Sequence, residues 1–182
     1  KNLAKMRADL EKYRISYDVW FFESSLHESG YVKETVDLLT QKGATYEKEG
    51  ALWLRTSEHG CDKDDVLRRA NGFYTYFAAD IAYHRNKFEQ RGFDRVVNIW
   101  GADHHGHVAR LKAALDILGL DGTNRLEIVL MQLVRLKRDG EAVRMSKRTG
   151  KAITLADLLD EIPCDAARYF FNSRAADTHL EF

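Results

Sequence analysis

The sequence predicts an α/β fold with a parallel sheet, preceded by an α+β segment and followed by a small helical piece. From residue 73 onward, strand-like and helix-like stretches alternate with short turns, which is typical of parallel strands joined by right-handed crossovers. Before residue 73 there are two hairpin signals, at Glu49-Gly50 and Asn71-Gly72. An apolar share of 45% and an aromatic share of 11% indicate a globular protein with a core.

Composition bounds the class of protein. The 182 residues carry 28 basic and 28 acidic side chains, so no overall field favours nucleic acid or a membrane, and any polyanion site must come from local clustering. Cys61 and Cys164 lie far apart, which disfavours a disulfide framework or a structural zinc site and suits a reducing cytosol. No apolar run has membrane-spanning length. Because the chain opens on Lys1 and stops on Phe182 within apparent elements, we expect a fragment of a longer protein.

The elements follow from periodicity and turn residues. The first 72 residues predict a helix over 3–13, an extended or irregular stretch over 17–22, a helix over 31–42 stopped by Gly43, and hairpins around 49–50 and 71–72. The next part predicts strands over 73–77, 95–100 and 127–136, with the middle one buried on both faces, and helices over 78–91 and 107–118 that end at Gly92 and Gly119. A hairpin at Asp139-Gly140 and helices over 155–162 and 166–172, capped by Thr154 and Asp165, complete the chain.

Ligands of such sheets bind beyond the carboxyl ends of the strands, which selects two places, Tyr76 to Asp80 and Gly101 to His107. We expect Tyr76 at a strand tip and Asp80 four residues on, in the first helical turn, on the same side and opening one pocket. A carboxylate there can hold a cation, and a planar guanidinium is its best bidentate partner. The alternative is an Asp at a helix start with no ligand.

The Gly101–His107 stretch follows a strand and precedes a helix. Asp103 can accept hydrogen bonds from ribose hydroxyls, Gly101 allows a nucleoside close to the backbone, and His104 and His105 can contact ribose or adenine. Asp-His-His-Gly is also the tetrad of the DHH phosphoesterases, which bind manganese with further aspartates, and here only Asp80 sits at a comparable strand end. A third alternative is a helix start capped by Asp103 with surface histidines.

A basic loop runs from Arg144 to Lys151, with four basic residues among eight and with Ser146, Thr149 and Gly150 between them. Lysine charge, a hydroxyl donor and glycine backbone suit a polyphosphate. A solvated loop is the simpler interpretation of the same charges.

Taken together, these residues resemble class I aminoacyl-tRNA synthetases, and specifically bacterial arginyl-tRNA synthetases. The stretch Arg144–Arg148 resembles the family's Lys-Met-Ser-Lys-Ser loop, and Gly101-Ala-Asp103 matches its Gly-x-Asp ribose motif. Further similar stretches cover nearly the whole chain: 18–21, 51–56, 75–84, 100–106, 165–171 and 176–181.

The resemblance implies the second half of a Rossmann-like nucleotide-binding fold. It divides the chain into an insertion (1–72), the C-terminal half of the catalytic domain (73–151) and the start of a helical stem-contact region (152–182). It implies activation of arginine with ATP to arginyl-adenylate and transfer of arginine to tRNA(Arg). The implied roles are arginine binding by Tyr76 and Asp80, ATP binding by Gly101, Asp103, His104, Met131, Val134 and Lys147, and catalysis by Arg144, Ser146 and Lys147, with Lys147 on the departing pyrophosphate.

Some positions depart from the family pattern. Arg144 replaces the first Lys of the loop and Arg148 its last Ser, and the other signature, His-x-Gly-His, is absent from its expected place. We therefore expect the isolated chain to be inactive. ATP is expected as a substrate that brings Mg2+, with no protein-held metal and no membrane partner, in a cytoplasmic enzyme that is monomeric at full length. The alternatives are a DHH-type manganese phosphoesterase and a non-catalytic module derived from a synthetase.

Overall fold

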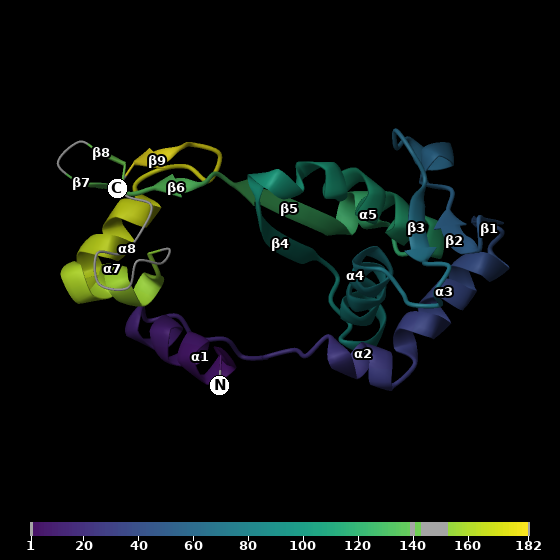
Figure 1. Cartoon of the computed structure of the whole chain (residues 1–182), viewed down its shortest axis with the longest axis horizontal. Helices are drawn as coiled ribbons and strands as arrows, with labels where there is room; N and C mark the ends of the chain where they lie inside the picture. The colour runs from purple at the N-terminus through teal and green to yellow at the C-terminus, as the bar shows by residue number, and fades with distance from the viewer. Residues whose placement is uncertain (1, 139–140, 143–152, 182) are drawn as a thin grey trace. The chain divides into compact units, whose positions relative to one another are not determined.

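The computed structural model describes residues 2–138, 141–142 and 153–181. The chain forms two compact units (Figure 1). One unit is Phe21–Val129, and the other combines Lys1–Trp20 with Leu130–Phe182. Within the described residues, no helix combines the length and apolar character needed to cross a membrane.

The core of the unit Phe21–Val129 is built from three helices and a small antiparallel sheet. Helix α3 (Tyr31–Gln41) contacts α4 (Tyr76–Arg85), which in turn contacts α5 (His105–Leu118), and α2 (Ser24–Glu28) packs beside α3. The predicted helix over 31–42 is confirmed as α3, and its apolar residues Val32, Val36 and Leu39 are buried. Fully buried side chains from these elements form the core: Val32, Leu39, Leu54, Leu67, Ile81, Leu111 and Leu115.

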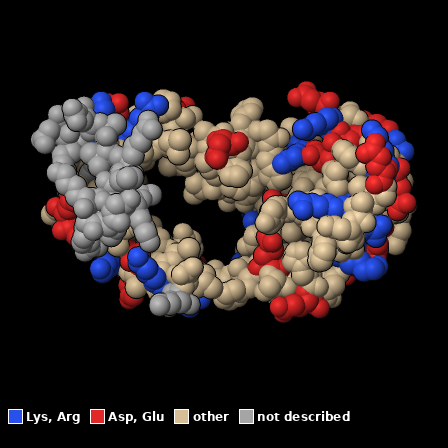
Figure 2. All heavy atoms as spheres, viewed as in Figure 1, with Lys and Arg blue, Asp and Glu red and all other residues tan. Residues whose placement is uncertain are grey.

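The first predicted hairpin is present. Strands β1 (Thr45–Lys48) and β2 (Ala51–Leu54) pair antiparallel with Lys48 opposite Ala51, and β3 (Asp65–Arg68) pairs with the other edge of β2. Glu49 and Gly50 both have positive φ, 53° and 74°, which matches the twist that a two-residue hairpin turn needs. A short 3-10 helix η1 (Thr56–His59) links β2 to β3. Figure 2 shows acidic and basic side chains interspersed over the visible face of this unit, in line with the balanced charge.

The predicted strand over 73–77 is wrong. Only Tyr74 pairs, through a single antiparallel bridge to Arg68, and α4 begins at Tyr76. The physical reason is Thr75, whose hydroxyl accepts a hydrogen bond from the Ala78 amide and so caps the helix. The predicted turn at Asn71-Gly72 does form, because the Gly72 amide bonds to the Arg69 carbonyl at 2.8 Å.

Helix α4 ends in a π turn, η2 (Asn86–Gln90), and Gly92 follows with φ 70°. Arg85 joins this segment to α3 because its guanidinium, 7% exposed, pairs with Glu34 at 2.9 Å and with Glu89 at 2.7 Å. Single π turns often occur at functional sites, and this one precedes the strand that forms the cavity described below.

The parallel sheet contains two strands among the described residues, β4 (Val96–Gly101) and β5 (Leu126–Met131), joined through α5 and α6 (Gly122–Arg125). The prediction that β4 is buried on both faces is wrong. Val96 and Asn98 are buried, whereas Val97 and Ile99 are 53% and 70% exposed. Alternate residues of a strand point to opposite faces, and only the Asn98 face meets side chains of the α4–η2 segment.

The second unit contains α1 (Asn2–Lys12), α7 (Leu155–Glu161) and α8 (Cys164–Asn172). The strand predicted over 127–136 breaks after Met131, where the Gln132 amide bonds to the Ala176 carbonyl. Beyond the break, β6 (Val134–Arg135) pairs parallel with β9 (Leu180–Glu181). The pairing of β7 (Lys137–Arg138) with β8 (Glu141–Ala142) matches the predicted hairpin.

The caps of the last two helices differ in outcome. Thr154 caps α7 as predicted, and with Asp157 it forms a capping box. Asp165 is not the cap of α8, because the helix starts at Cys164 after Pro163, whose φ of −56° suits a helix start. The Asp165 carboxylate instead pairs with Arg14 at 2.6 Å. The predicted loop residues Arg144, Ser146 and Lys147 lie outside the described residues.

Candidate functional site

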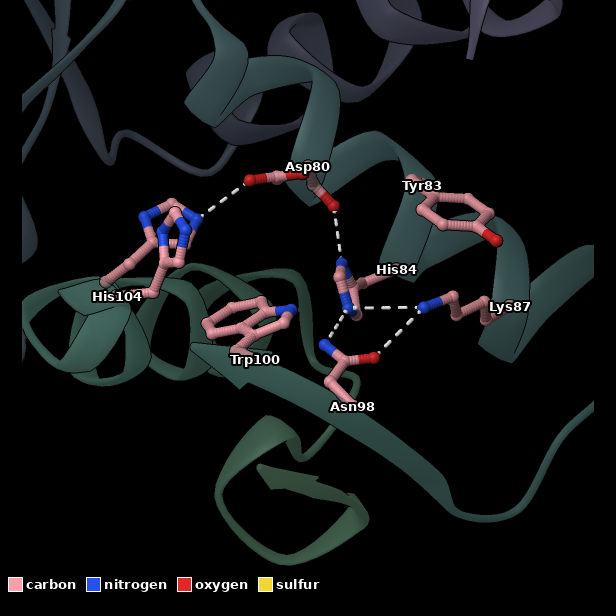
Figure 3. A pocket seen from close by; sticks show the side chains of 8 residues that line it. Asp80, Tyr83, His84, Lys87, Asn98, Trp100 and His104 are labelled. Atoms are coloured by element: carbon pink, nitrogen blue, oxygen red, sulfur yellow. Dashed lines mark hydrogen bonds and ion pairs between the residues drawn. The ribbon is translucent and has the colours of Figure 1, made fainter. Parts of the chain in front are cut away.

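A cavity of about 290 Å3 lies between the α4–η2 segment, β4 and the start of α5 (Figure 3). Residues spaced three and four apart on a helix share a face, and alternate residues of a strand do so too. The cavity is therefore lined by one face of the α4–η2 segment, by one face of β4 and by two histidines: Asp80, Tyr83, His84, Lys87, Asn98, Trp100, His104 and His107.

Asp80 supplies the carboxylate of this cavity, with its side chain 35% exposed. Its Oδ2 lies 2.8 Å from Nε2 of His107, and Nδ1 of His107 accepts a hydrogen bond from Nε of Arg110 at 2.6 Å. Arginine can only donate hydrogen bonds, so Nδ1 of His107 is an acceptor. Nε2 of His107 therefore carries the ring proton and donates a hydrogen bond to Asp80. Among the described residues, no donor reaches the other carboxylate oxygen, Oδ1, which is available to a ligand.

His84 forms the floor of the cavity and is 3% exposed. Its Nδ1 donates to the backbone carbonyl of Asp80 at 2.7 Å, and its Nε2 accepts from Nδ2 of Asn98 at 2.6 Å. Burial, and then the nearby charge of Lys87, lower the pKa of His84 to about 4. The imidazole is therefore neutral at pH 7, in the tautomer with the proton on Nδ1.

Lys87 places a positive charge in the same cavity. Its ammonium donates to Oδ1 of Asn98 at 3.1 Å and lies 4.2 Å from the ring centroid of Tyr83. Burial, and then the charge of Arg91, lower its pKa to about 8, while Asp80 opposes this shift. The cavity thus contains both a carboxylate and a cation. Hydrogen bonds of one consistent direction run from the Lys87 ammonium through Asn98 and His84 to the backbone carbonyl of Asp80.

Trp100 gives the cavity an aromatic wall. Its ring centroid lies 5.3 Å from that of His107 and 6.2 Å from that of His104. Flat aromatic faces attract planar cations such as guanidinium and also stack on nucleobases. The wall, the carboxylate and the buried donors are together suited to a small ligand with a planar cationic group.

The structure does not bring Tyr76 and Asp80 into one pocket. Tyr76 is 83% exposed as the first residue of α4, and the described cavity does not include it. Asp80 is the fifth residue of α4, so its placement in the first helical turn is also wrong. The cause is the earlier start of the helix at the Thr75 cap. The role of Tyr76 in arginine binding stays a prediction.

The Gly101–His104 stretch is a strand-to-helix turn, as predicted. Strand β4 ends at Gly101, and a 3-10 turn η3 (Ala102–His104) leads into α5. Asp103 is 80% exposed and does not cap α5, so the plain helix-cap interpretation is wrong. A Cβ at Gly101 would lie 2.7 Å from Oδ1 of Asp103, so glycine there leaves room for the carboxylate to turn back over the strand end.

Some of the other predicted residues are not among those that line this cavity, and some lie outside the described residues. Met131 and Val134, 41% and 37% exposed, are in the second unit. Within the described ranges, no three histidine, cysteine or acidic side chains are placed to hold a metal ion, so the manganese alternative gains no support. Sequence reasoning assigned no role to the cavity residues Tyr83, His84, Lys87, Asn98, Trp100 and His107, although His107 ends the selected Gly101–His107 stretch. The 80/84/87 helical spacing and the 98/100 alternation were available signals for the others.

The fold is that of part of the catalytic domain of class I aminoacyl-tRNA synthetases. Residues 2–177 match the family model described as "tRNA synthetases class I (R), catalytic domain", and the chain belongs to this family. It is 60% identical, over all 182 residues, to proteins named arginine–tRNA ligase from Ruminiclostridium cellulolyticum and from Caldanaerobacter subterraneus subsp. tengcongensis. The chain spans 32% of the length of each of these relatives.

Solved structures give the same relation. One, described as an arginyl tRNA synthetase from Campylobacter jejuni, has a TM-score of 0.90 and 44% identity, and the match covers 99% of this chain and 38% of that one. The Thermus thermophilus arginyl-tRNA synthetase shares the fold, with a TM-score of 0.82 at 18% identity over 99% of this chain and 40% of that one. These matches confirm the predicted resemblance and the Rossmann-like α/β class.

Proposed function

We propose that this chain is part of the catalytic domain of an arginine–tRNA ligase, which activates arginine with ATP to arginyl-adenylate and transfers arginine to tRNA(Arg). The observation that carries the proposal is the Asp80 carboxylate, held at one oxygen by His107 and open at the other, inside a cavity with an aromatic wall. Membership of the family and the names of the relatives support the same reaction.

In the arginine site, Oδ1 of Asp80 accepts hydrogen bonds from the substrate guanidinium. A carboxylate–guanidinium pair is charge-assisted and directional, so it distinguishes arginine from neutral analogues of the same shape. Trp100 offers a flat face to that group, and Lys87 repels a cation that enters beyond Asp80. Tyr76 is assigned to the amino end of arginine from the motif alone.

In the ATP site, Gly101, Asp103 and His104 take the ribose and the adjoining nucleoside, and backbone groups from Met131 to Val134 meet adenine. Ser146 and Lys147, with Arg144 beside them, bind the triphosphate. The arginine carboxylate attacks the α-phosphorus, pyrophosphate leaves, and Lys147 stabilises the charge on the leaving group. This chemistry rests on positioning and electrostatics, without a covalent enzyme intermediate. Mg2+ arrives with ATP, and no resident metal is needed.

The remaining proposals concern the whole protein. Its partners are arginine, ATP and tRNA(Arg), its compartment is the cytoplasm, and at full length it is a monomer. The isolated chain is expected to be inactive, because it contains one of the two class I signatures. The alternative is a non-catalytic module derived from a synthetase. A full-length protein without any exchange activity would favour that alternative.

The test is arginine-dependent ATP–pyrophosphate exchange in the full-length protein that contains this chain. Asp80→Asn keeps the shape but removes the charge, and loss of one hydrogen bond to a charged group costs about 1.5–3 kcal/mol. We expect the KM for arginine to rise about 10- to 100-fold. Asp37→Asn, on the exposed face of α3, is the matched control.

A neutral probe sharpens this test. Citrulline has the shape of arginine but a urea in place of the guanidinium, so Asp80→Asn should also reduce the preference for arginine over citrulline as measured by competitive inhibition. An unchanged KM and an unchanged preference would remove Asp80 from the guanidinium site.

A further inference from the structure

Four side chains form a continuous chain of hydrogen bonds from the small antiparallel sheet to the cavity, in the order Asp65, Arg110, His107, Asp80. We propose that His107 is a positioning residue that keeps Asp80 available to a substrate guanidinium by separating it from the protein's own guanidinium, Arg110. This inference rests on the proposed function, since it concerns the selectivity of the same arginine site.

The geometry is close throughout the chain. NH1 of Arg110 lies 2.5 Å from Oδ1 of Asp65, Nε of Arg110 lies 2.6 Å from Nδ1 of His107, and Nε2 of His107 lies 2.8 Å from Oδ2 of Asp80. The side chains of Asp65 and His107 are 12% and 11% exposed, so water competes little for these bonds. Three elements supply the four residues: β3, α5 and α4.

The direction of the protons follows from Arg110. Its guanidinium can only donate hydrogen bonds, so Arg110 donates one to Asp65 and one to His107. Nδ1 of His107 is therefore the acceptor, and Nε2 holds the single ring proton and donates a hydrogen bond to Asp80. The histidine is neutral, and Asp80 receives a hydrogen bond without a full positive charge beside it.

Two aromatic contacts fix the imidazole between its partners. The ring of Phe77 meets His107 edge-on at 5.6 Å between centroids, and Trp100 lies at 5.3 Å on the cavity side. Phe77 also lies under the Arg110 guanidinium, with 5.1 Å from Cζ to the ring centroid. These contacts hold the side chains of His107 and Arg110 in place, so packing fixes the order in which the four residues are hydrogen-bonded.

The arrangement answers a problem particular to this kind of site. A carboxylate selected to bind guanidinium is equally attractive to a resident arginine, and Arg110 stands three residues beyond His107 on the same helix. Asp65 accepts from NH1 of Arg110 and His107 accepts from its Nε, so both engaged donor groups have acceptors other than Asp80. Without His107, a charge-assisted pair between Arg110 and Asp80 would compete with the substrate.

The experiment compares three variants of the full-length protein in arginine-dependent ATP–pyrophosphate exchange. His107→Ala should raise the KM for arginine about 10- to 100-fold, the scale of one charge-assisted hydrogen bond, with the KM for ATP unchanged. His107→Ala/Arg110→Ala should recover most of that loss, because the competing guanidinium is gone. His107→Gln should stay close to wild type, since its amide can donate to Asp80 and accept from Arg110. Lys112→Ala removes another cation from α5 and serves as the control.

The double variant separates this role from a merely structural one, because a residue needed only for packing would give a double variant as weak as the single one or weaker. That result, or an unchanged arginine KM in His107→Ala, would overturn the inference. Absence of arginine-dependent exchange in the wild-type protein would instead refute the proposed function.

A second measurement needs no substitution and stands even if a variant fails to fold. Nitrogen-15 NMR of the full-length wild-type protein at neutral pH should show His107 as the neutral tautomer protonated at Nε2. An imidazolium, or a tautomer protonated at Nδ1, would contradict the proposed order of the bonds.

Discussion

His84 gives the protein a pH-dependent stability that one substitution should remove. The ring is 3% exposed and its pKa is lowered to about 4, first by burial and then by the charge of Lys87. In the unfolded chain the same histidine has a pKa near 6.5. Between these values the unfolded chain binds a proton that the folded chain does not. The stability is therefore full above pH 6.5 and falls as the pH drops toward 4.

The size of the effect follows from the same two values. Each pKa unit corresponds to about 1.4 kcal/mol, so the wild type should lose about 3 kcal/mol through His84 between pH 6.5 and 4. His84→Gln keeps a donor for the Asp80 carbonyl and an acceptor for Asn98, but it cannot titrate. Its stability should therefore fall by about 3 kcal/mol less than that of the wild type over this interval.

The assay is urea denaturation at several pH values from 4 to 7.5, followed by tryptophan fluorescence. Trp53 and Trp100 lie in the same unit as His84 and report its unfolding. His59→Gln, at an exposed position in η1, is the matched control and should retain the wild-type slope. Parallel curves for the wild type and His84→Gln would refute a buried, neutral His84.

Three further predictions concern other parts of the fold. The pKa of Lys87 is lowered from 10.5 to about 8, so between these pH values the unfolded chain binds a proton that the folded chain has lost, and stability should rise with pH. Carbon-13 NMR of the lysine side chain should show a titration midpoint near 8, and a midpoint above 10 would contradict this. Thr154→Ala removes the capping box of α7 and should cost about 1 kcal/mol in urea denaturation, and no loss would mean that the cap contributes nothing. Leu111→Ala, at a side chain with no exposed surface, should destabilise its unit by about 2–5 kcal/mol, whereas a cost below 1 kcal/mol would show that the core collapses around the gap.

Local signals predicted several elements well. Helix α3 ends at Gln41 before Gly43, and the Glu49-Gly50 turn joins β1 to β2 where the sequence indicates. These features depend on residues next to one another in the chain, namely the conformational freedom of glycine and one amphipathic face. No distant partner is needed to decide them.

Elements that depend on distant partners were less predictable. Residues Phe73 to Phe77 have strand-forming side chains, but only Tyr74 finds a partner strand residue, Arg68, and the Thr75 cap, which is a local signal, starts helix α4 at Tyr76. Strand β4 is apolar except at Asn98, yet Val97 and Ile99 stay exposed because the described unit covers one face only. Which faces are covered is decided by packing, and an apolar run does not specify it.

The residues of the candidate site also fall into two groups, those that the sequence predicted and those that it did not. Asp80 and the Gly101–His104 turn were predicted because a carboxylate and a turn that begins with glycine have recognisable chemistry, although the strand expected before Asp80 does not form. Lys87, Asn98 and His107 were missed, because each is an ordinary residue until helix spacing and strand alternation bring it to the cavity. Their importance lies in their hydrogen-bond partners, which the sequence does not name.

The bond between Asp65 and Arg110 bears on how such enzymes can be recombined. Asp65 lies in the segment 1–72, which the resemblance predicts to be an insertion and which would then be a unit for exchange between relatives. A chimaera that replaces this segment without an acid at the position of Asp65 would release Arg110, and the defect would emerge at a distance, as poor recognition of arginine. The predicted junction at residues 72 and 73 is crossed by this hydrogen-bond network, so a graft should include both ends of the network.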